Sequence, residues 1–146
     1  MKITQHFKLE EFAKSETAKR LGIDNSIPAA LISNIKALCE NVLQPLRDYV
    51  GVPIKISSGY RCPQLNAAVG GAKSSQHMKG EAADIHIPSV EVGRKWFEIL
   101  KTLPHDQLIW ERNSPTSNHY WIHVSCRADL SKNRGQCIPL LNKYSA

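Results

Sequence analysis

Apolar residues recur at helical spacing along the chain after Pro28. These residues are Leu31, Ile35, Leu38, Val42 and Leu46. Their spacing of three or four positions places them on one side of a helix, which we expect to be buried in the core. Pro45 lies late in the pattern and lacks a backbone N–H, so we expect a kink or a break near Gln44.

Two further stretches are predicted to be helical. Residues 90–103 place apolar side chains on one face after Ser89, which is a candidate N-cap. Residues 7–22 are expected to form short helices that end at Gly22.

Four segments are predicted to be strands: residues 54–58, 82–87, 107–111 and 120–125. In the last three, alternation separates an apolar face from a polar face. The polar-face positions are Asp84 and His86, then Gln107, Ile109 and Glu111, and then Trp121, His123 and Ser125. The order of elements predicts an α+β fold, with helices packed on one face of a small, mainly antiparallel sheet. We expect a single domain over residues 1–146, with an irregular tail from Cys126 that gives no functional signal.

The net charge of +6 and the pI near 9.3 favour anionic partners, such as nucleic acid, an anionic cell-wall polymer or a membrane surface. The basic residues are scattered rather than interleaved with aromatic residues, so we interpret them as a solvated surface and expect no nucleic-acid binding. No apolar run approaches the roughly 20 residues of a membrane span, and residues 1–12 lack the apolar core of a signal peptide. We therefore expect a monomer that is cytoplasmic as synthesised and does not insert into a membrane. Any release to the cell wall would occur without a cleaved signal.

The four cysteines, Cys39, Cys62, Cys126 and Cys137, show no C-x-x-C spacing. Without a secretory signal, we expect free thiols rather than disulfides. A contribution of Cys62 or Cys126 to a metal site stays open.

His77, Asp84 and His123 form a candidate metal site. Two imidazoles and one carboxylate are a ligand set that zinc accepts, with at least one coordination position left open. Such an ion lowers the pKa of water and polarises a carbonyl; hydrolysis also needs a base, for which Glu111 is our candidate. Arg61, which follows the first strand, is the candidate for holding a substrate carboxylate or a developing oxyanion. Structural roles compete with this hypothesis, because a lone histidine is more often a core or surface residue and Asp84 could cap a turn.

The motifs around these residues resemble those of a known family. They are Ser58-Gly59-Tyr60-Arg61, Ser75-x-His77-x-x-Gly80-x-Ala82-x-Asp84 and Trp121-x-His123. From about Phe7 to Ser125 the chain resembles the zinc D-Ala-D-Ala carboxypeptidases. That family also includes D-Ala-D-Ala dipeptidases and phage L-alanyl-D-glutamate endolysins, and its fold is shared with the hedgehog signalling domain. The resemblance implies zinc on His77, Asp84 and His123, and cleavage of peptide bonds in peptidoglycan stem peptides or their precursors. It also implies that Arg61 and Ser75 contact the substrate, and Trp121 in the last motif is our third candidate for such contact.

One position departs from the pattern of this family. Many members carry Asp or Glu three residues before the second histidine, and Tyr120 stands there in this chain. The base must then come from elsewhere, so Glu111 remains the candidate, with His119 and His86 as alternatives. The leading hypothesis is a zinc peptidase of peptidoglycan, either a carboxypeptidase or an endolysin-type endopeptidase of a phage or prophage. The alternative is a non-catalytic, zinc-containing module that binds cell-wall peptides.

Overall fold

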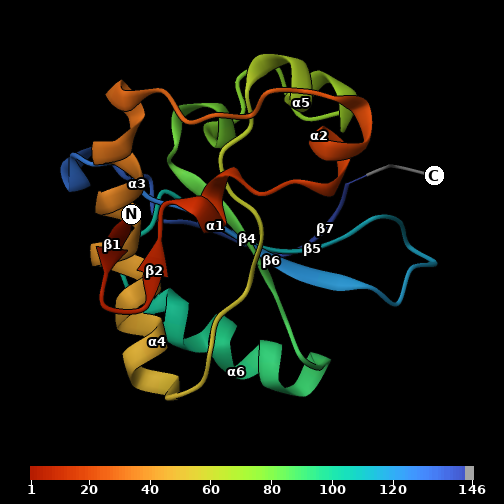
Figure 1. The fold of residues 1–146 in the computed structure, drawn as a ribbon. Coiled ribbons are helices and arrows are strands. Elements are labelled where there is room, and N and C mark those ends of the chain that lie inside the picture. Colours follow the sequence, from red (N-terminus) through yellow and green to blue (C-terminus); the bar gives the residue numbers. More distant parts are fainter. Residues whose placement is uncertain (144–146) are drawn as a thin grey trace.

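A computed structural model describes residues 1–143 of the chain. The α-helices are α1 (Glu10–Ala13), α2 (Glu16–Leu21), α3 (Ile32–Leu38), α4 (Gln44–Val50), α5 (Pro63–Ala68) and α6 (Val90–Lys101). The strands are β1 (Lys2–Thr4), β2 (Phe7–Lys8), β3 (Ile56–Ser58), β4 (Ala82–His86), β5 (Gln107–Arg112), β6 (Tyr120–Ser125) and β7 (Gln136–Asn142). Short 3-10 helices span Ala29–Leu31, Gln76–Lys79 and Leu130–Lys132. The predicted α+β class is confirmed (Figure 1).

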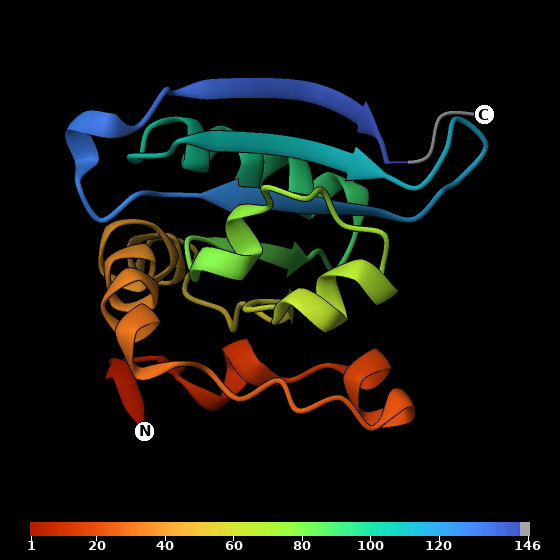
Figure 2. The ribbon, with the colours of Figure 1, turned by 90° about the horizontal axis from the view of Figure 1, so that it is seen from above.

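The main sheet has five strands in the order β3-β4-β6-β5-β7. Its strand pairs are antiparallel except β5 with β7, so the prediction of a mainly antiparallel sheet is confirmed. The prediction of an irregular tail from Cys126 is wrong, because β7 extends the sheet beside β5 (Figure 2). Pro139 lies within β7, and an outer strand tolerates the missing backbone N–H.

The long apolar pattern after Pro28 forms α3 and α4, joined by a π-helix over Cys39–Leu43. The five predicted stripe residues except Leu31 are almost completely buried, and Leu31 packs against the core at its edge. A kink or a break is predicted near Gln44. The helix does not break there, but it widens into the π-helix before that residue, and α4 begins at Gln44 with Pro45 at its second position. A wider turn is one way for a helix to admit a proline without a steric clash.

The core joins the apolar face of the sheet to α6, to α4 and to the buried side of α3. The sheet contributes Ala83, Ile85, Leu108, Trp110, Ile122 and Val124, the apolar-face positions predicted from alternation. Helix α6 begins at the predicted cap, where Ser89 Oγ accepts a hydrogen bond of 3.1 Å from Val92 N. In Figure 2, α6 lies on one side of the sheet, while α5 and the turn Gln76–Lys79 lie on the other. The expectation that the helices pack on one face of the sheet is therefore wrong, because the segment between β3 and β4 folds over the polar face. The core helices do not cover the polar face of the sheet, so this face is available for a site.

A buried asparagine connects the N-terminal segment to the segment that follows β3. Asn25 Nδ2 donates to the carbonyls of Ala13 and Tyr60, each at 3.0 Å, and Asn25 Oδ1 accepts from Cys62 N at 2.8 Å. Glycine is needed at position 59, because a Cβ there would lie 2.7 Å from the Cα of Phe12. These contacts fix the backbone of residues 59–62 beside the polar face of β4.

No helix within residues 1–143 is long and apolar enough to cross a membrane. The four cysteines, all within the described residues, are free thiols, as predicted.

Candidate metal centre and cleft

The turn Gln76–Lys79 presents His77, which is only 3% exposed. Ser75 Oγ accepts a hydrogen bond of 3.2 Å from His77 N and begins the turn. The Nδ1 atom of His77 lies 2.7 Å from the carbonyl oxygen of Gly59. Since a carbonyl can only accept, Nδ1 carries the proton and the lone pair is on Nε2. The ring is thus held with Nε2 available to a metal.

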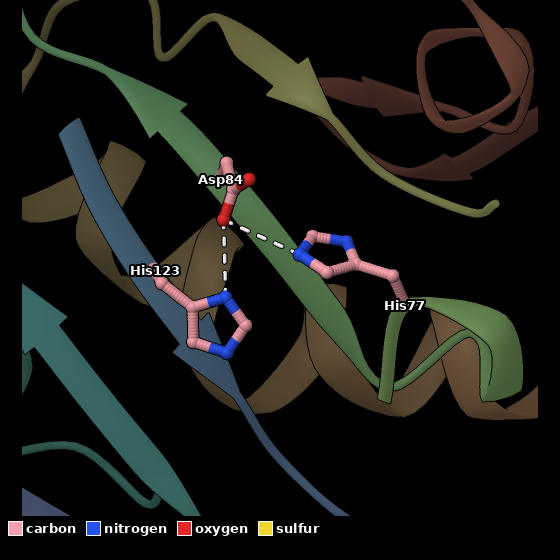
Figure 3. Close-up of side chains that lie close together, drawn as sticks. All are labelled: His77, Asp84 and His123. Carbon is pink, nitrogen blue, oxygen red and sulfur yellow. Dashed lines mark hydrogen bonds and ion pairs between the residues drawn. The ribbon is translucent and has the colours of Figure 1, made fainter. Parts of the chain in front are cut away.

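Asp84 and His123 come from neighbouring strands. They lie directly opposite one another in the antiparallel pair of β4 with β6, on the polar face predicted from alternation. Asp84 Oδ1 lies 3.0 Å from His123 Nδ1 and 3.3 Å from His77 Nε2 (Figure 3). Three segments that are far apart in the sequence therefore bring their donor atoms to one point.

The spacing of these donor atoms fits a zinc ion. Their three ligand atoms all lie within 4.8 Å of one another. Zinc bonds of 2.0–2.1 Å at tetrahedral angles imply ligand atoms roughly 3.3–3.4 Å apart, close to the two distances from Asp84 Oδ1. His77, Asp84 and His123 thus form a group that could hold zinc, with room for a further ligand on the open side.

The electrostatics of the cluster favour the protonation states that bind metal. Burial lowers the pKa of His77, although the Asp84 carboxylate acts in the opposite direction. Burial alone would raise the pKa of Asp84, but the two imidazoles hold it well below its usual range. Arg61 Nη2 lies 3.3 Å from Asp84 Oδ2 and forms an ion pair on the side away from the histidines. The carboxylate is therefore ionised and His77 is neutral at neutral pH.

Arg61 is itself held in place by polar neighbours. Its Nε donates to Ser58 Oγ at 3.0 Å and its Nη1 donates to Asn66 Oδ1 at 3.4 Å. The side chain is buried, and its backbone N donates to the carbonyl of His77 at 3.1 Å. The guanidinium thus orients Asp84 and reaches the edge of the cavity described next.

A cavity of about 710 Å³ opens beside the three donor residues. Arg61, Ser75 and Glu111, which the sequence analysis singled out, all line it. Glu111 lies opposite Trp121 in the pair of β5 with β6, two positions from Ile109, which faces His123. Burial raises the pKa of Glu111, and the nearby Asp84 carboxylate raises it further. A half-buried carboxyl group with a raised pKa, in the same cavity as the donor cluster, is suited to accept and return a proton.

A family model described as Peptidase M15 matches residues 5–125. The chain belongs to this family. Its members are zinc-dependent peptidases of the D-Ala-D-Ala carboxypeptidase and endolysin type, so the family that the motifs indicated is confirmed. A search of the curated proteins finds no match.

In this M15 peptidase, Tyr120 packs against the core and also lines a smaller cavity of about 240 Å³. Its ring lies 5.5 Å from that of Trp110, and its hydroxyl accepts a hydrogen bond of 3.1 Å from Arg112 Nη1. Among the described residues that line the large cavity, the carboxylates are those of Asp84 and Glu111. Asp84 is engaged with both histidines, which leaves Glu111 as the cavity's candidate base.

Trp121 lies in a different place from the other substrate-binding candidates. It lines a second cavity of about 240 Å³, together with His86 and His119, the two alternative bases. Of the three candidate metal ligands, Asp84 lines both cavities, whereas His77 and His123 line only the larger one.

Several cavity residues of the M15 peptidase were missed by the sequence analysis. They are Lys79, Gln107, Ile109, Arg127, Arg134, Leu141, Asn142 and Lys143. Alternation marked Gln107 and Ile109 as polar-face positions, but gave them no function. The residues after 125 carried no signal, because their approach to the cavity depends on β7 pairing with β5 in parallel.

Proposed function

We propose that this M15 peptidase hydrolyses peptide bonds in the stem peptides of peptidoglycan, with zinc bound by His77, Asp84 and His123. The observation that supports the proposal most strongly is the convergence of these three donor groups at a cavity that Glu111 also lines. When bound, zinc would supply Lewis acidity that polarises the scissile carbonyl and makes water a stronger acid.

The side chains of the protein would then manage the protons. Glu111 takes one proton from the attacking water and returns it to the leaving amine as the carbon–nitrogen bond breaks, so the carboxylate is regenerated. Its raised pKa brings its basicity closer to neutral pH and favours the return of the proton. Arg61 holds Oδ2 of Asp84, which leaves Oδ1 for the metal, and it borders the cavity where a substrate oxygen would lie.

Cleavage inside a peptide, rather than at its carboxyl end, is favoured by the two cavities. Because Asp84 borders both, a substrate has space on either side of the bond that is cut. Ser75 lines the larger cavity and Trp121 the smaller, so we assign them to opposite sides of that bond. The products of a digest distinguish the two activities, since a carboxypeptidase releases single terminal residues.

The test combines elemental analysis with digestion of purified peptidoglycan followed by mass spectrometry. We expect about one zinc per wild-type chain and new peptide fragments. His123→Ala should lose both the zinc and the fragments. Glu111→Gln should keep zinc, but its kcat should be lower by a factor of roughly 10²–10⁴, as expected when a general base is removed. The matched control, Glu98→Gln, changes an exposed glutamate on α6 and should keep full activity.

Two results would contradict the proposal. Full activity of Glu111→Gln would exclude this residue as the base and direct attention to His119 and His86. Zinc without fragments from any stem peptide would instead favour the non-catalytic binding module.

A further inference from the structure

The family model matches the chain only as far as Ser125, but residues after Ser125 also line the large cavity. Residues 126–143 follow β6, pass through the 3-10 helix Leu130–Lys132 and return along β5 as β7. Five of these residues line the large cavity: Arg127, Arg134, Leu141, Asn142 and Lys143. In Figure 2, β7 lies beside β5 at the outer edge of the sheet. We call residues 126–143 the C-terminal wall.

The C-terminal wall is tied firmly to the rest of the sheet. Asp106, which is 0% exposed, accepts hydrogen bonds from Arg134 Nη2 at 2.7 Å and from Arg134 N at 2.8 Å. Backbone hydrogen bonds add to this attachment, from Gly135 N to the carbonyl of His105 and from Gln136 N to that of Asp106. The wall is therefore a fixed surface of the cavity, able to select among substrates.

Cationic side chains outnumber carboxylates around the large cavity, and the C-terminal wall supplies most of the cations. Five cationic side chains line the cavity, against two carboxylates, and the wall supplies Arg127, Arg134 and Lys143. Arg127 and Arg134 share a single buried carboxylate, Asp106, with Arg127 Nε 3.5 Å from its Oδ1. One negative charge cannot neutralise two guanidinium groups, so positive charge is left at the cavity.

We propose that the C-terminal wall determines specificity, and that it selects peptides with a free carboxylate on the side of the scissile bond that faces Arg127 and Arg134. This inference rests on the proposed peptidase function and names the substrate class within it. A carboxylate facing guanidinium groups at the edge of a cavity is stabilised by charge, whereas a primary amide of the same shape is not. A preference of about tenfold in kcat/KM for the free carboxylate is the expected size for one partly exposed charged contact.

The experiment compares two soluble stem peptides that are identical except at one acidic residue. Its carboxylate is free in the first peptide and is a primary amide in the second. The measured quantity is the ratio of their kcat/KM values. This ratio cancels any effect of a variant on steps that both peptides share. Melting temperatures of all variants verify that each one folds.

Two variants change the wall, and each has a matched control. Arg127→Gln removes a cation at the cavity, and Lys132→Gln removes an exposed cation of the same segment that does not line it. Leu141→Glu adds a carboxylate at the cavity, where the leucine is 39% exposed. Leu140→Glu adds the same charge at the preceding residue, which is 45% exposed and does not line the cavity.

We expect the wild-type ratio to favour the free carboxylate and to fall toward one in Arg127→Gln and Leu141→Glu. Both controls should keep the wild-type ratio. If the wild type cleaves both peptides equally, or if its preference survives in both wall variants, the inference is overturned while the proposed function stands. If the wild type cleaves neither peptide, the proposed function fails, and this inference fails with it.

Discussion

Replacing Asp106 by asparagine removes the charge that holds the C-terminal wall. Burial alone would raise the pKa of Asp106, but the hydrogen bonds from Arg134 and the charge of Arg127 lower it to about 2 from the ordinary 3.8. At 1.36 kcal/mol per pKa unit, this shift corresponds to about 2 kcal/mol of stability. The variant also leaves the guanidinium of Arg134 without its carboxylate partner. Arg134 is half exposed, so water replaces part of the interaction, and we expect a total loss of about 2–4 kcal/mol.

The assay is urea unfolding at several pH values. At pH 7, the free energy of unfolding of Asp106→Asn should be lower than that of wild type by about 2–4 kcal/mol. This corresponds to roughly 6–14 °C in melting temperature for a domain of this size. The stabilisation by Asp106 is fully present above its unfolded pKa of 3.8 and is lost as the pH falls through about 2. The difference between wild type and variant should therefore shrink across this window.

The control is Asp129→Asn, which changes an exposed aspartate of the same segment. Asp129 caps the 3-10 helix Leu130–Lys132 by accepting a hydrogen bond from Ser131 N at 3.1 Å. Asparagine caps equally well, so we expect a change within about 0.5 kcal/mol. The reasoning is refuted if Asp106→Asn is as stable as wild type at pH 7, or if its deficit persists unchanged in acid.

Three further predictions concern the cleft. The kcat/KM of wild type should fall as the pH falls through the pKa of Glu111, which lies above the ordinary 4.5; a profile that stays flat down to pH 4 would contradict this role. Gly71→Ala places a Cβ 2.0 Å from Asn66 Oδ1 and 3.1 Å from Arg61 Nη1, so it should cost about 1–3 kcal/mol of stability and reduce kcat/KM. Unchanged values of both would show that Asn66 moves aside freely. Removing metal with a chelator should lower the melting temperature of wild type. Zinc at 100 times its Kd should then raise the free energy of unfolding by about 2.7 kcal/mol in wild type and leave that of His77→Ala unchanged.

The alternation of apolar and polar residues in β4 and β6 allowed the sequence to predict which side chains share a face of the sheet. Asp84 and His123 fall on one face because Ala83, Ile85 and Val124 need the other, and the structure pairs these two polar residues directly. A period of two is hard to misread when one face is buried, since a shift of one residue would expose the core. The helix predictions after Pro28 and after Ser89 succeeded for the same reason, because each stretch has a single apolar face. Residues 7–22 form α1 and α2 as expected, but Phe7–Lys8 is a strand, because it pairs with β1.

The remaining features depend on contacts that leave no local pattern. β7 contains Pro139 and shows no alternation, so its parallel pairing with β5 could not be predicted. The carbonyl of Gly59 orients His77, but every residue has such a carbonyl and only the fold selects this one. Glu111 was identified because its strand neighbours the one that carries His123. Arg127 and Arg134 lie in a segment where nothing distinguishes them from other basic surface residues.

The fold holds the side chains of His77, Asp84 and His123 in place, and this affects how one metal ion would replace another at the site. Two of these residues lie on paired central strands and the third is fixed by a backbone carbonyl, so the protein, and not the ion, arranges them. Small domains such as zinc fingers unfold without their metal, but a preformed set of ligands allows the apo protein to stay folded. The apoenzyme should accept cobalt in place of zinc while its far-ultraviolet circular dichroism stays unchanged. Absorption bands of the substituted ion would then report directly on the geometry around it.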